Sequence, residues 1–460
     1  MLIDGSPLPP SAVAAIAART ESVELSDSAR TRAAQSNAYA EQVSKERHVY
    51  GRSTGVGANR QVPVADPEAF AHALLRSHAS AAGPERSPER IRAMLAVRLN
   101  QLAAGGSGVT PELLDRLAAM LVADALPPVR EYGSIGTADL SALARTALAL
   151  MGELPTSAPL PATLPFGPHD ALPFLSSNAA TIGDAALAHE ALHRLARAAL
   201  QVAALSFTAV DGNPEAFAPA AAAATPFPGA REVCRVLGEL LPYPALPARI
   251  QDPFGLRALP QVHGAYLDAL DRLGKVTSRY TAAPAENPVL LPDIGVAHHG
   301  GFHAAYLVQA LDATVSAAAQ SAQLALARLA MLVEPAYTGL EPFLSDGTPA
   351  ASGVMVAEYI GASALAALRS LATPAAIQSV TISRGVEEDA SFASLAAKQA
   401  LDAVSPYRIV LACELLAAVR ALRLRGVEPA GPVGKLPDNS ADRDLTEDID
   451  QACELLDELA

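Results

Sequence analysis

Apolar residues recur every three to four positions along most of the chain, which is the spacing of one face of an α-helix. In the first third, this pattern predicts helices at residues 11–20, 27–46, 67–80, 87–104, 111–124 and 140–152. From residue 170 onward it predicts longer helices, at residues 179–207, 231–239, 262–283, 301–331, 354–371, 392–425 and 446–459. Several exceed the usual length of about 11–12 residues. The pattern therefore predicts an all-α fold with a central bundle of long helices.

Glycine and proline interrupt the helical pattern at three places. Residues 49–57 read VYGRSTGVG and predict a loop, because glycine is a poor helix former. A second glycine loop covers residues 131–139, and a connection rich in proline and alanine covers residues 154–168. We therefore predict an N-terminal domain at residues 1–168, followed by the long-helix bundle and a C-terminal helical region at residues 169–460.

Composition narrows the possible partners of the chain. Half of the 460 residues are hydrophobic, but only 4% are aromatic, so the core must be built mainly from Ala, Leu and Val. A net charge of -14, without a run of Lys and Arg, argues against nucleic-acid binding. Apolar stretches such as residues 218–224 are shorter than the roughly 20 residues of a membrane span, and the first residues lack the basic start of a signal peptide. We expect a cytoplasmic protein without a membrane partner.

Seven short motifs, in the same order and spread over nearly the whole chain, resemble those of one enzyme family. Residues 49–57 resemble YGxxTGFG, residues 133–144 resemble GSVG-ASG-DLAPLA, and residues 251–257 resemble QDPYSLR. Residues 286–288, 300–303, 352–357 and 386–389 resemble TDNP, GGNFHG, SGLMIA and NQED. The chain thus resembles the aromatic amino acid lyases, which include histidine, phenylalanine and tyrosine ammonia-lyases and aminomutases. The resemblance implies a homotetramer in which each active site draws residues from three chains.

One family element is incomplete in this sequence. The family's Ala-Ser-Gly triplet cyclises to a methylidene-imidazolone electrophile: the Gly nitrogen attacks the Ala carbonyl, and the Ser loses water. Between Gly136 and Asp139 this chain has only Thr137 and Ala138. The loop is one residue short and lacks both the Ser and the Gly. We therefore expect no methylidene-imidazolone and no other cofactor.

The resemblance assigns two residues to the chemistry. Tyr50 matches the catalytic base, and a phenol needs a lowered pKa to take a proton at neutral pH, so a nearby cation or helix N-terminus is expected. Arg257 matches the residue that holds the substrate carboxylate, because a guanidinium grips a carboxylate through two parallel hydrogen bonds. The structural alternatives are a packed loop tyrosine and an interhelix ion pair.

Five further positions match the lining of the family's pocket. Gln251, Asn287 and Phe302 match residues that bind or shape the substrate. Phe254 stands where QDPY has a tyrosine, and Ser176 falls where the family has asparagine. The pocket is therefore expected at the family's place, with fewer polar groups than the family provides.

Acidic and histidine residues complete the candidate site. Glu388 matches the residue that approaches the substrate amine in histidine-specific members, and His78 matches a position that selects the side chain. A solvated helix-cap acid and a structural histidine are the alternatives. His298, His299 and His303 suggest a metal site by their spacing, but neither cysteine nor carboxylate accompanies them. The three cysteines lie far apart along the chain, at Cys234, Cys413 and Cys453, and no two have the spacing of a metal site. We therefore expect no metal and no disulfide.

Three functions fit these residues. The leading interpretation is an enzyme without the imidazolone, in which Tyr50 starts an elimination, isomerisation or cyclisation of a small carboxylate or amino-acid derivative, in specialised metabolism. The second is an aromatic amino acid ammonia-lyase of the histidine type with a cofactor altered at residues 136–138. The third is a binding protein on the same scaffold, because a fold alone does not establish activity.

Overall fold

The computed structural model describes residues 1–241 and 246–460, and these form two compact units. Unit 1 comprises Met1–Glu190, Leu273–Leu311 and Pro374–Leu401. Unit 2 comprises Ala191–Arg272, Asp312–Thr373 and Asp402–Ala460. Each unit is assembled from three stretches of the chain, whereas the sequence predicted a single boundary after residue 168.

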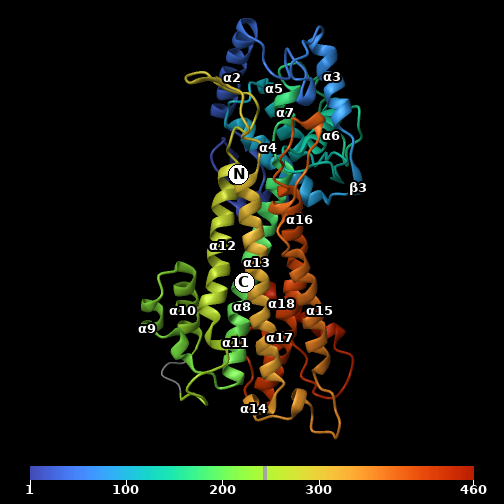
Figure 1. Cartoon of the computed structure of the whole chain (residues 1–460). Helices are drawn as coiled ribbons and strands as arrows, with labels where there is room; N and C mark the ends of the chain where they lie inside the picture. The colour runs from blue at the N-terminus through green and yellow to red at the C-terminus, as the bar shows by residue number, and fades with distance from the viewer. Residues whose placement is uncertain (242–245) are drawn as a thin grey trace. The chain divides into compact units, whose positions relative to one another are not determined.

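Unit 1 contains short helices and three small sheets (Figure 1). Its first seven helices are α1 (Pro10–Ala17), α2 (Asp27–Glu46), α3 (Pro67–His78), α4 (Pro88–Ala103), α5 (Pro111–Val122), α6 (Leu140–Leu150) and α7 (Ala171–Leu175). Each sheet has two strands: β1 (Leu2–Ile3) with β2 (Glu24–Leu25) in parallel, and, antiparallel, β3 (Ala82–Glu85) with β4 (Arg130–Tyr132) and β5 (Val289–Leu291) with β6 (Gly295–Ala297).

Polar side chains start several of these helices. Ser26 caps α2 by accepting a hydrogen bond from the backbone N–H of Ala29, and Asp66 caps α3 in the same way. Proline occupies the first turn of α1, α3, α4 and α5, where its missing N–H costs nothing. These local signals explain why the predicted starts of the early helices agree with the structure to within a residue.

The long helices contribute most of unit 2. Three of them have residues in both units: α8 (Ala179–Ala209), α12 (Leu259–Tyr280) and α13 (Ala305–Leu332). The others in unit 2 are α9 (Pro219–Ala224), α10 (Pro228–Leu240), α11 (Phe254–Arg257), α14 (Pro335–Thr338), α15 (Met355–Leu371), α17 (Val404–Leu424) and α18 (Thr446–Glu458). Figure 1 shows α15, α17 and α18 side by side. The predicted all-α fold with long helices is confirmed.

One predicted helix is divided in the structure. The pattern predicted a single helix at residues 392–425, whereas α16 (Ala393–Asp402) ends before α17 begins at Val404. Pro406 lies in the first turn of α17. Because proline has no N–H, it cannot donate to the carbonyl four residues earlier, at Asp402. The apolar period continues across this point, so the pattern alone did not reveal the break.

A buried ion pair holds unit 1 together near its centre. Arg98 of α4 is fully buried, and its Nη1 donates to Glu286 Oε1 at 2.8 Å. Its Nε and Nη2 donate to the carbonyl oxygens of Phe174 and Pro173, in α7, at 3.1 and 2.6 Å. Arg98 thus fixes α7 and the segment that precedes β5 to the same helix.

Unit 2 contains a comparable pair. Arg328 of α13 donates from Nε and Nη2 to the two carboxylate oxygens of Glu414 in α17, at 2.6 and 2.9 Å. Ser206 adds a hydrogen bond to Glu414 at 2.7 Å. The remaining nitrogen of Arg328, Nη1, donates to the carbonyl oxygen of Gly255 at 3.0 Å. This pair therefore fixes α11, which carries Arg257.

We expect Arg98→Met to lower the free energy of unfolding by about 3–5 kcal/mol, because Glu286 would remain buried without its partner. Urea titration followed by circular dichroism measures the change. Arg76→Met is the control, since it breaks the exposed pair with Glu153 and should change stability little. Equal stability of the two variants would contradict a structural role of the buried pair.

Candidate active site

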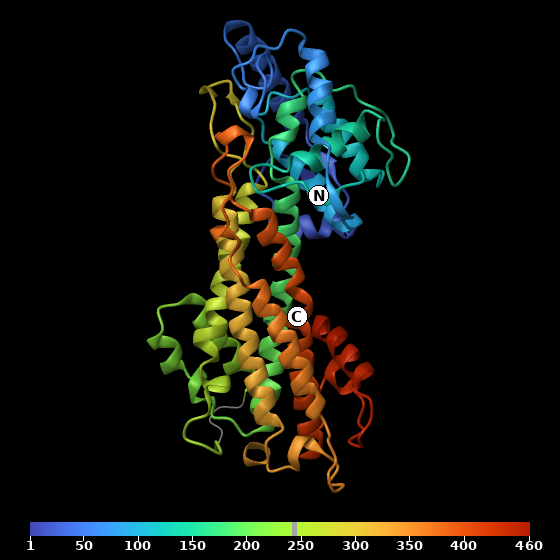
Figure 2. The same ribbon diagram turned by 45° about the vertical axis from the view of Figure 1, so that its right-hand side comes forward.

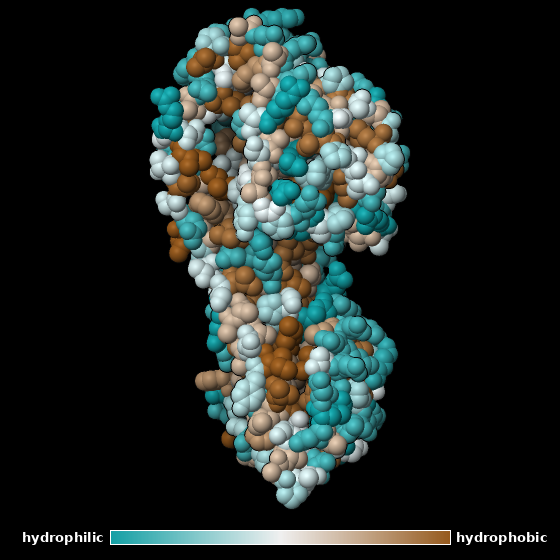
Figure 3. Space-filling model, turned by 90° about the vertical axis from the view of Figure 1, so that its right-hand side faces the viewer, coloured by the Kyte–Doolittle hydropathy of each residue, from teal (hydrophilic) through white to brown (hydrophobic). Residues whose placement is uncertain are grey.

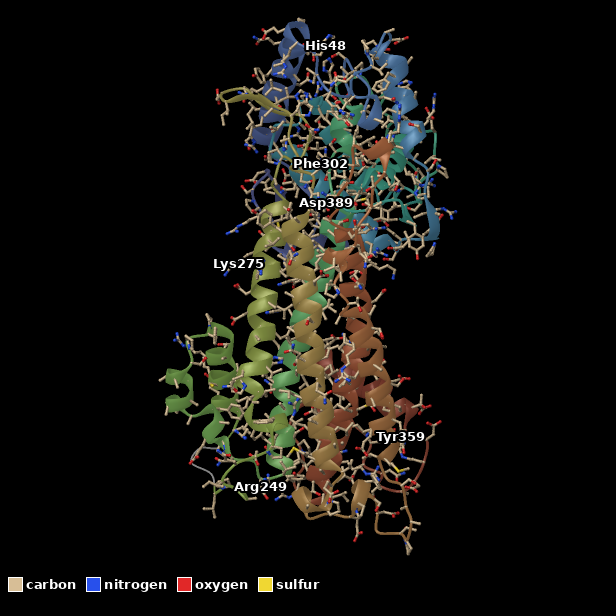
Figure 4. All side chains as sticks on the ribbon, viewed as in Figure 1. His48, Arg249, Lys275, Phe302, Tyr359 and Asp389 are labelled. Carbon is tan, nitrogen blue, oxygen red and sulfur yellow. The ribbon has the colours of Figure 1, made fainter. Side chains whose placement is uncertain are left out.

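Unit 1 contains a cavity of about 1190 Å³ that opens to solvent, called the unit 1 cavity below. Its walls come from the loop at residues 48–61, the end of α3, the loop at 137–140, α7, residues 287–303 and residues 383–389. Figure 2 shows the yellow β5–β6 hairpin and the orange segment at residues 383–392 beside the blue N-terminal elements. His48, Phe302 and Asp389, labelled in Figure 4, all line this cavity.

The unit 1 cavity brings together most of the predicted site residues. The predicted residues along its walls are Tyr50, His78, Thr137, Ala138, Ser176, Asn287, Phe302 and Glu388. Gln251, Phe254 and Arg257 belong to unit 2 and do not line it. Sequence reasoning also missed His48, Leu172, Leu175, Glu387 and Asp389 as lining residues. Glu387 and Asp389 flank Glu388 in the motif at residues 386–389, and this position could have identified them as lining residues.

Backbone geometry places the Tyr50 ring. Gly51 has φ of +68°, and a Cβ there would lie 1.8 Å from the side chain of Leu172, so only glycine fits. The backbone N–H of Tyr50 donates to His298 Nε2 at 3.2 Å. The phenolic oxygen accepts a hydrogen bond from the N–H of Gly57 at 2.8 Å. The loop therefore holds the ring at both ends.

The phenol of Tyr50 has a raised pKa in this chain. Burial is the largest cause, the Gly57 N–H opposes it, and the charge of Glu387 raises the pKa further. Arg60 is the cation that the sequence led us to expect, but its lowering effect is the smallest of the four. The expected net lowering of the pKa is therefore wrong for the chain by itself. At neutral pH the phenol is protonated.

Hydrogen bonds hold the loop at residues 136–139 in an open conformation. The carbonyl oxygen of Gly136 accepts from Ser391 Oγ at 2.7 Å, and the N–H of Ala138 donates to Asn178 Oδ1 at 3.0 Å. The buried carboxylate of Asp139 accepts from the N–H and hydroxyl of Thr181 at 2.8 and 3.0 Å. The atoms that ring closure would join, the Gly136 carbonyl carbon and the Ala138 nitrogen, therefore belong to groups already engaged elsewhere.

The methylidene-imidazolone does not fit these residues. Thr137 and Ala138 supply neither the serine that would lose water nor the glycine nitrogen that would close the ring. Ala138 also has φ of +94°, a backbone region that favours glycine. Closure at residues 136–138 would require Ala138 to give up its hydrogen bond to Asn178. No step is therefore assigned to such a group.

Carboxylates gather at one wall of the unit 1 cavity. Glu387, Glu388 and Asp389 follow one another along the chain, and all three line it. Asp389 lies 3.3 Å from His303 Nε2. A cationic group of a bound molecule would be stabilised by this wall. These carboxylates suit a bound ammonium group better than a bound anion.

The other histidines near the cavity are held by hydrogen bonds. His78 Nδ1 lies 2.9 Å from the carbonyl oxygen of Leu74, so it carries the proton and Nε2 is the acceptor in the neutral ring. His299 donates from Nε2 to the carbonyl of Glu286 at 2.7 Å and accepts at Nδ1 from Gly301 at 2.9 Å. Because both nitrogens of His299 are occupied, it cannot also bind a metal. Within residues 1–241 and 246–460 there is no metal-binding group of three His, Cys, Asp or Glu residues.

Arg257 occupies a different setting in unit 2. Its guanidinium lies 4.5 Å from the ring centre of Phe254, which is 64% exposed. Its Nε donates to the carbonyl oxygen of Asp252 at 2.8 Å. In the described part of the chain, this hydrogen bond engages only Nε of Arg257. The two terminal nitrogens are left for a carboxylate. Gln251 is exposed next to this group.

Comparison with known proteins identifies what the chain resembles. The family model described as aromatic amino acid lyase matches residues 8–443. A histidine ammonia-lyase from Anaeromyxobacter dehalogenans is 34% identical over 100% of this chain and 98% of its own length. The structure of histidine ammonia-lyase from Trypanosoma cruzi is 26% identical, has a TM-score of 0.89, and is matched over 99% of this chain and 93% of that one.

A third comparison concerns the fold alone. Ergothionase from Treponema denticola, an ergothioneine-degrading enzyme, has a TM-score of 0.92 at 23% identity, over 100% of this chain and 99% of that one. The histidine ammonia-lyase relatives contradict the leading interpretation of the sequence, an imidazolone-free enzyme acting on other small carboxylates by elimination, isomerisation or cyclisation. That interpretation rested on the loop at residues 136–139, whereas the relatives match the chain over its whole length. The ammonia-lyase alternative agrees better with the relatives.

We expect the purified protein to have the mass of the unmodified chain, because residues 136–139 do not fit the ring. Intact-mass spectrometry measures this, and peptide mapping of the loop locates any change. Asn178→Ala is a useful companion variant, because it removes the acceptor that holds the Ala138 N–H. A loss of two water molecules within residues 134–139 of the wild-type protein would contradict the expectation.

Proposed function

Because this chain belongs to the aromatic amino acid lyase family, we propose that it is a histidine-type ammonia-lyase. Such an enzyme releases ammonia from an amino acid that carries a polar aromatic ring. The observation that carries the proposal is the convergence of Tyr50, His78 and Glu388 on the unit 1 cavity. Relatives named histidine ammonia-lyase that match the chain over its whole length support it.

The reaction needs one proton acceptor and a place for the departing nitrogen. A base takes a proton from the β-carbon, the released electron pair forms the double bond, and the bond from the α-carbon to nitrogen breaks. The nitrogen keeps that bond's electron pair and leaves as ammonia. Tyr50 is the proposed base. The ammonium group of the substrate would favour its phenolate, because a nearby cation lowers the pKa of an acid.

His78 supports an imidazole side chain at the other end of the substrate. Its Nε2 is an acceptor in the neutral ring, because Nδ1 bonds the carbonyl of Leu74. A substrate imidazole has an N–H to donate to it, whereas a phenyl ring has none. A half-buried acceptor left without its donor penalises the apolar analogue. This difference favours histidine over phenylalanine.

Glu388 is the proposed partner of the substrate amine. It lies on the acidic wall, between Glu387 and Asp389, and is exposed to the cavity. Asn287 shapes the wall nearby, because its Oδ1 accepts the backbone N–H of His299 at 2.9 Å. Phe302 and Ser176 complete the lining. An ammonium group near Glu388 would also lie close to the acids that surround it.

The carboxylate of the substrate requires a guanidinium clamp, and Arg60, the arginine that lines the unit 1 cavity, is not the residue that the family motif assigns to it. We propose that Arg257 of another subunit supplies it, in a homotetramer. Two terminal nitrogens on a ring-stacked guanidinium suit a carboxylate. The short α11 that carries Arg257 is fixed by Arg328, so the guanidinium is positioned before assembly.

Exposed apolar surface supports assembly. Val356 and Tyr359 of α15 are 45% and 67% exposed, and Figure 3 shows apolar residues gathered on one face of the molecule. Residues Met355–Ile377 are long and apolar enough to cross a membrane by length and composition, with 28% of the tested window buried. A helix that packs against a second copy has the same composition. Large exposed apolar patches are typical of interaction surfaces.

We expect the wild-type protein to release ammonia from L-histidine, faster than from L-phenylalanine, L-tyrosine or ergothioneine. Tyr50→Phe should reduce turnover by about 10²–10⁴-fold, because the base is lost while the ring remains. A coupled ammonia assay and the absorbance of the unsaturated acid measure both. Tyr132→Phe, an exposed phenol outside the cavity, is the control. No ammonia from any aromatic amino acid would refute the proposed function.

Shared active sites predict complementation between inactive variants. Tyr50→Phe and Arg257→Lys should each be slow alone, the second because lysine cannot make the paired contact. A tetramer mixed from both contains some sites with an intact tyrosine and an intact arginine. Dissociated and reassembled mixtures should therefore regain activity. Mixtures no faster than the average of the two parents would place both residues in the same subunit's site.

A further inference from the structure

The unit 1 cavity contains a histidine–carboxylate pair, and the proposed function leaves its histidine unused. His303, just before α13, lines the cavity, and its side chain is 28% exposed. Its Nε2 lies 3.3 Å from Asp389 Oδ2, and the Asp389 side chain is 77% exposed. Both residues line the cavity, and the Asp389 side chain is also largely open to solvent.

The chemistry proposed for Tyr50 requires such a connection. Each turnover leaves a proton on the phenol, and the base must lose it before the next turnover. The phenol of Tyr50 is half-buried, and the N–H of Gly57 already occupies one acceptor position of its oxygen. A group that titrates close to neutral pH accepts a proton readily at working pH, and histidine is such a group.

We propose that His303 and Asp389 form a proton-transfer pair that carries the proton of each turnover from the cavity to solvent. The inference rests on the proposed function. The proton removed from the β-carbon moves from Tyr50, through water in the cavity, to the free ring nitrogen of His303. The ring becomes an imidazolium, balanced by the Asp389 carboxylate, and then loses the proton to solvent. No bond other than those to this proton changes.

The other titratable groups along the cavity are less suited to this role. His78 and His298 are each held through a ring nitrogen by a backbone group, at Leu74 and Tyr50 respectively. His48 Nδ1 lies 3.3 Å from Ser53 Oγ.

Two acids on the same wall are also excluded. Glu388 is the proposed partner of the substrate amine, and the charge of Glu387 acts on Tyr50 itself, so neither is left for proton release. Among the histidines that line the cavity in the described part of the chain, His303 is the one in ion-pair range of a carboxylate.

His303→Gln tests the pair at saturating L-histidine in dilute buffer. Turnover should fall by roughly 10²-fold with kcat/KM little changed, because proton release, which follows the chemical step, becomes rate-limiting. Added imidazole should restore turnover as its concentration rises, because it carries the proton that His303 carried. Tyr50→Phe should gain nothing from imidazole, since its defect is in proton abstraction. A purely structural role of His303 would give a variant that no buffer rescues, which would overturn the proposal.

Asp389→Asn is a second variant that is safer for folding, because the side chain is largely exposed. The imidazolium of His303 is less stable without the carboxylate. The part of the pH profile of turnover that depends on His303 should therefore shift to lower pH. Tyr50, His78, His298, Glu387 and Glu388 remain around the cavity and are unchanged in this comparison.

The control and the outcomes separate the two proposals. Asp293→Asn, an exposed acid in the turn between β5 and β6, should behave as wild type. A double variant His303→Gln, Asp389→Asn should be no slower than His303→Gln, because Asp389 acts through His303. Full turnover of His303→Gln in dilute buffer overturns the pair and leaves the lyase intact. A wild-type protein that releases no ammonia overturns both.

Discussion

The buried guanidinium of Arg98 is the interaction on which the unit 1 cavity depends. It donates to Glu286 and to two carbonyl groups of α7, so one side chain sets the relative position of two cavity walls. Burial opposes both charges: it lowers the pKa of Arg98 and raises that of Glu286. Such a pair contributes little net stability, but removing one member costs much. The pair instead fixes the positions of two cavity residues. Ser176 directly follows α7, and Asn287 directly follows Glu286.

Unit 2 uses the same device for a different part of the proposed site. Two nitrogens of Arg328 donate to Glu414, and the third donates to the carbonyl oxygen of Gly255. Gly255 lies at the start of α11, which carries Arg257. A substrate clamp works only if its guanidinium is held before the substrate arrives, since ordering it on binding costs conformational entropy. The stacked Phe254 restrains the same guanidinium from one face. The replacement of a phenol by phenylalanine therefore removes a proton donor and keeps the stacking surface.

The sequence predicted the fold better than it predicted the chemistry. Helix positions followed from apolar spacing and from capping residues such as Ser26 and Asp66, which act locally. Several residues of the unit 1 cavity, including Tyr50, Asn287 and Phe302, followed from motifs. The protonation state of Tyr50 could not be predicted, because it depends on burial and on Glu387, more than 300 residues away in the chain. The pairing of His303 with Asp389 is likewise a tertiary contact, which no local pattern indicates.

The acidic wall acts on the pKa of Tyr50 as well as on the proposed substrate amine. Burial raises the pKa of the phenol most, and the charge of Glu387 raises it further, so the base rests in its protonated form. A substrate ammonium group at Glu388 would neutralise part of that negative field, and the same charge would then favour the phenolate. In the proposed reaction, binding and activation of the base would therefore be coupled through electrostatics, without a change of shape. A neutral ligand of the same size would occupy the cavity and leave Tyr50 protonated, so the wall would select for a cationic amine in the chemical step as well as in binding.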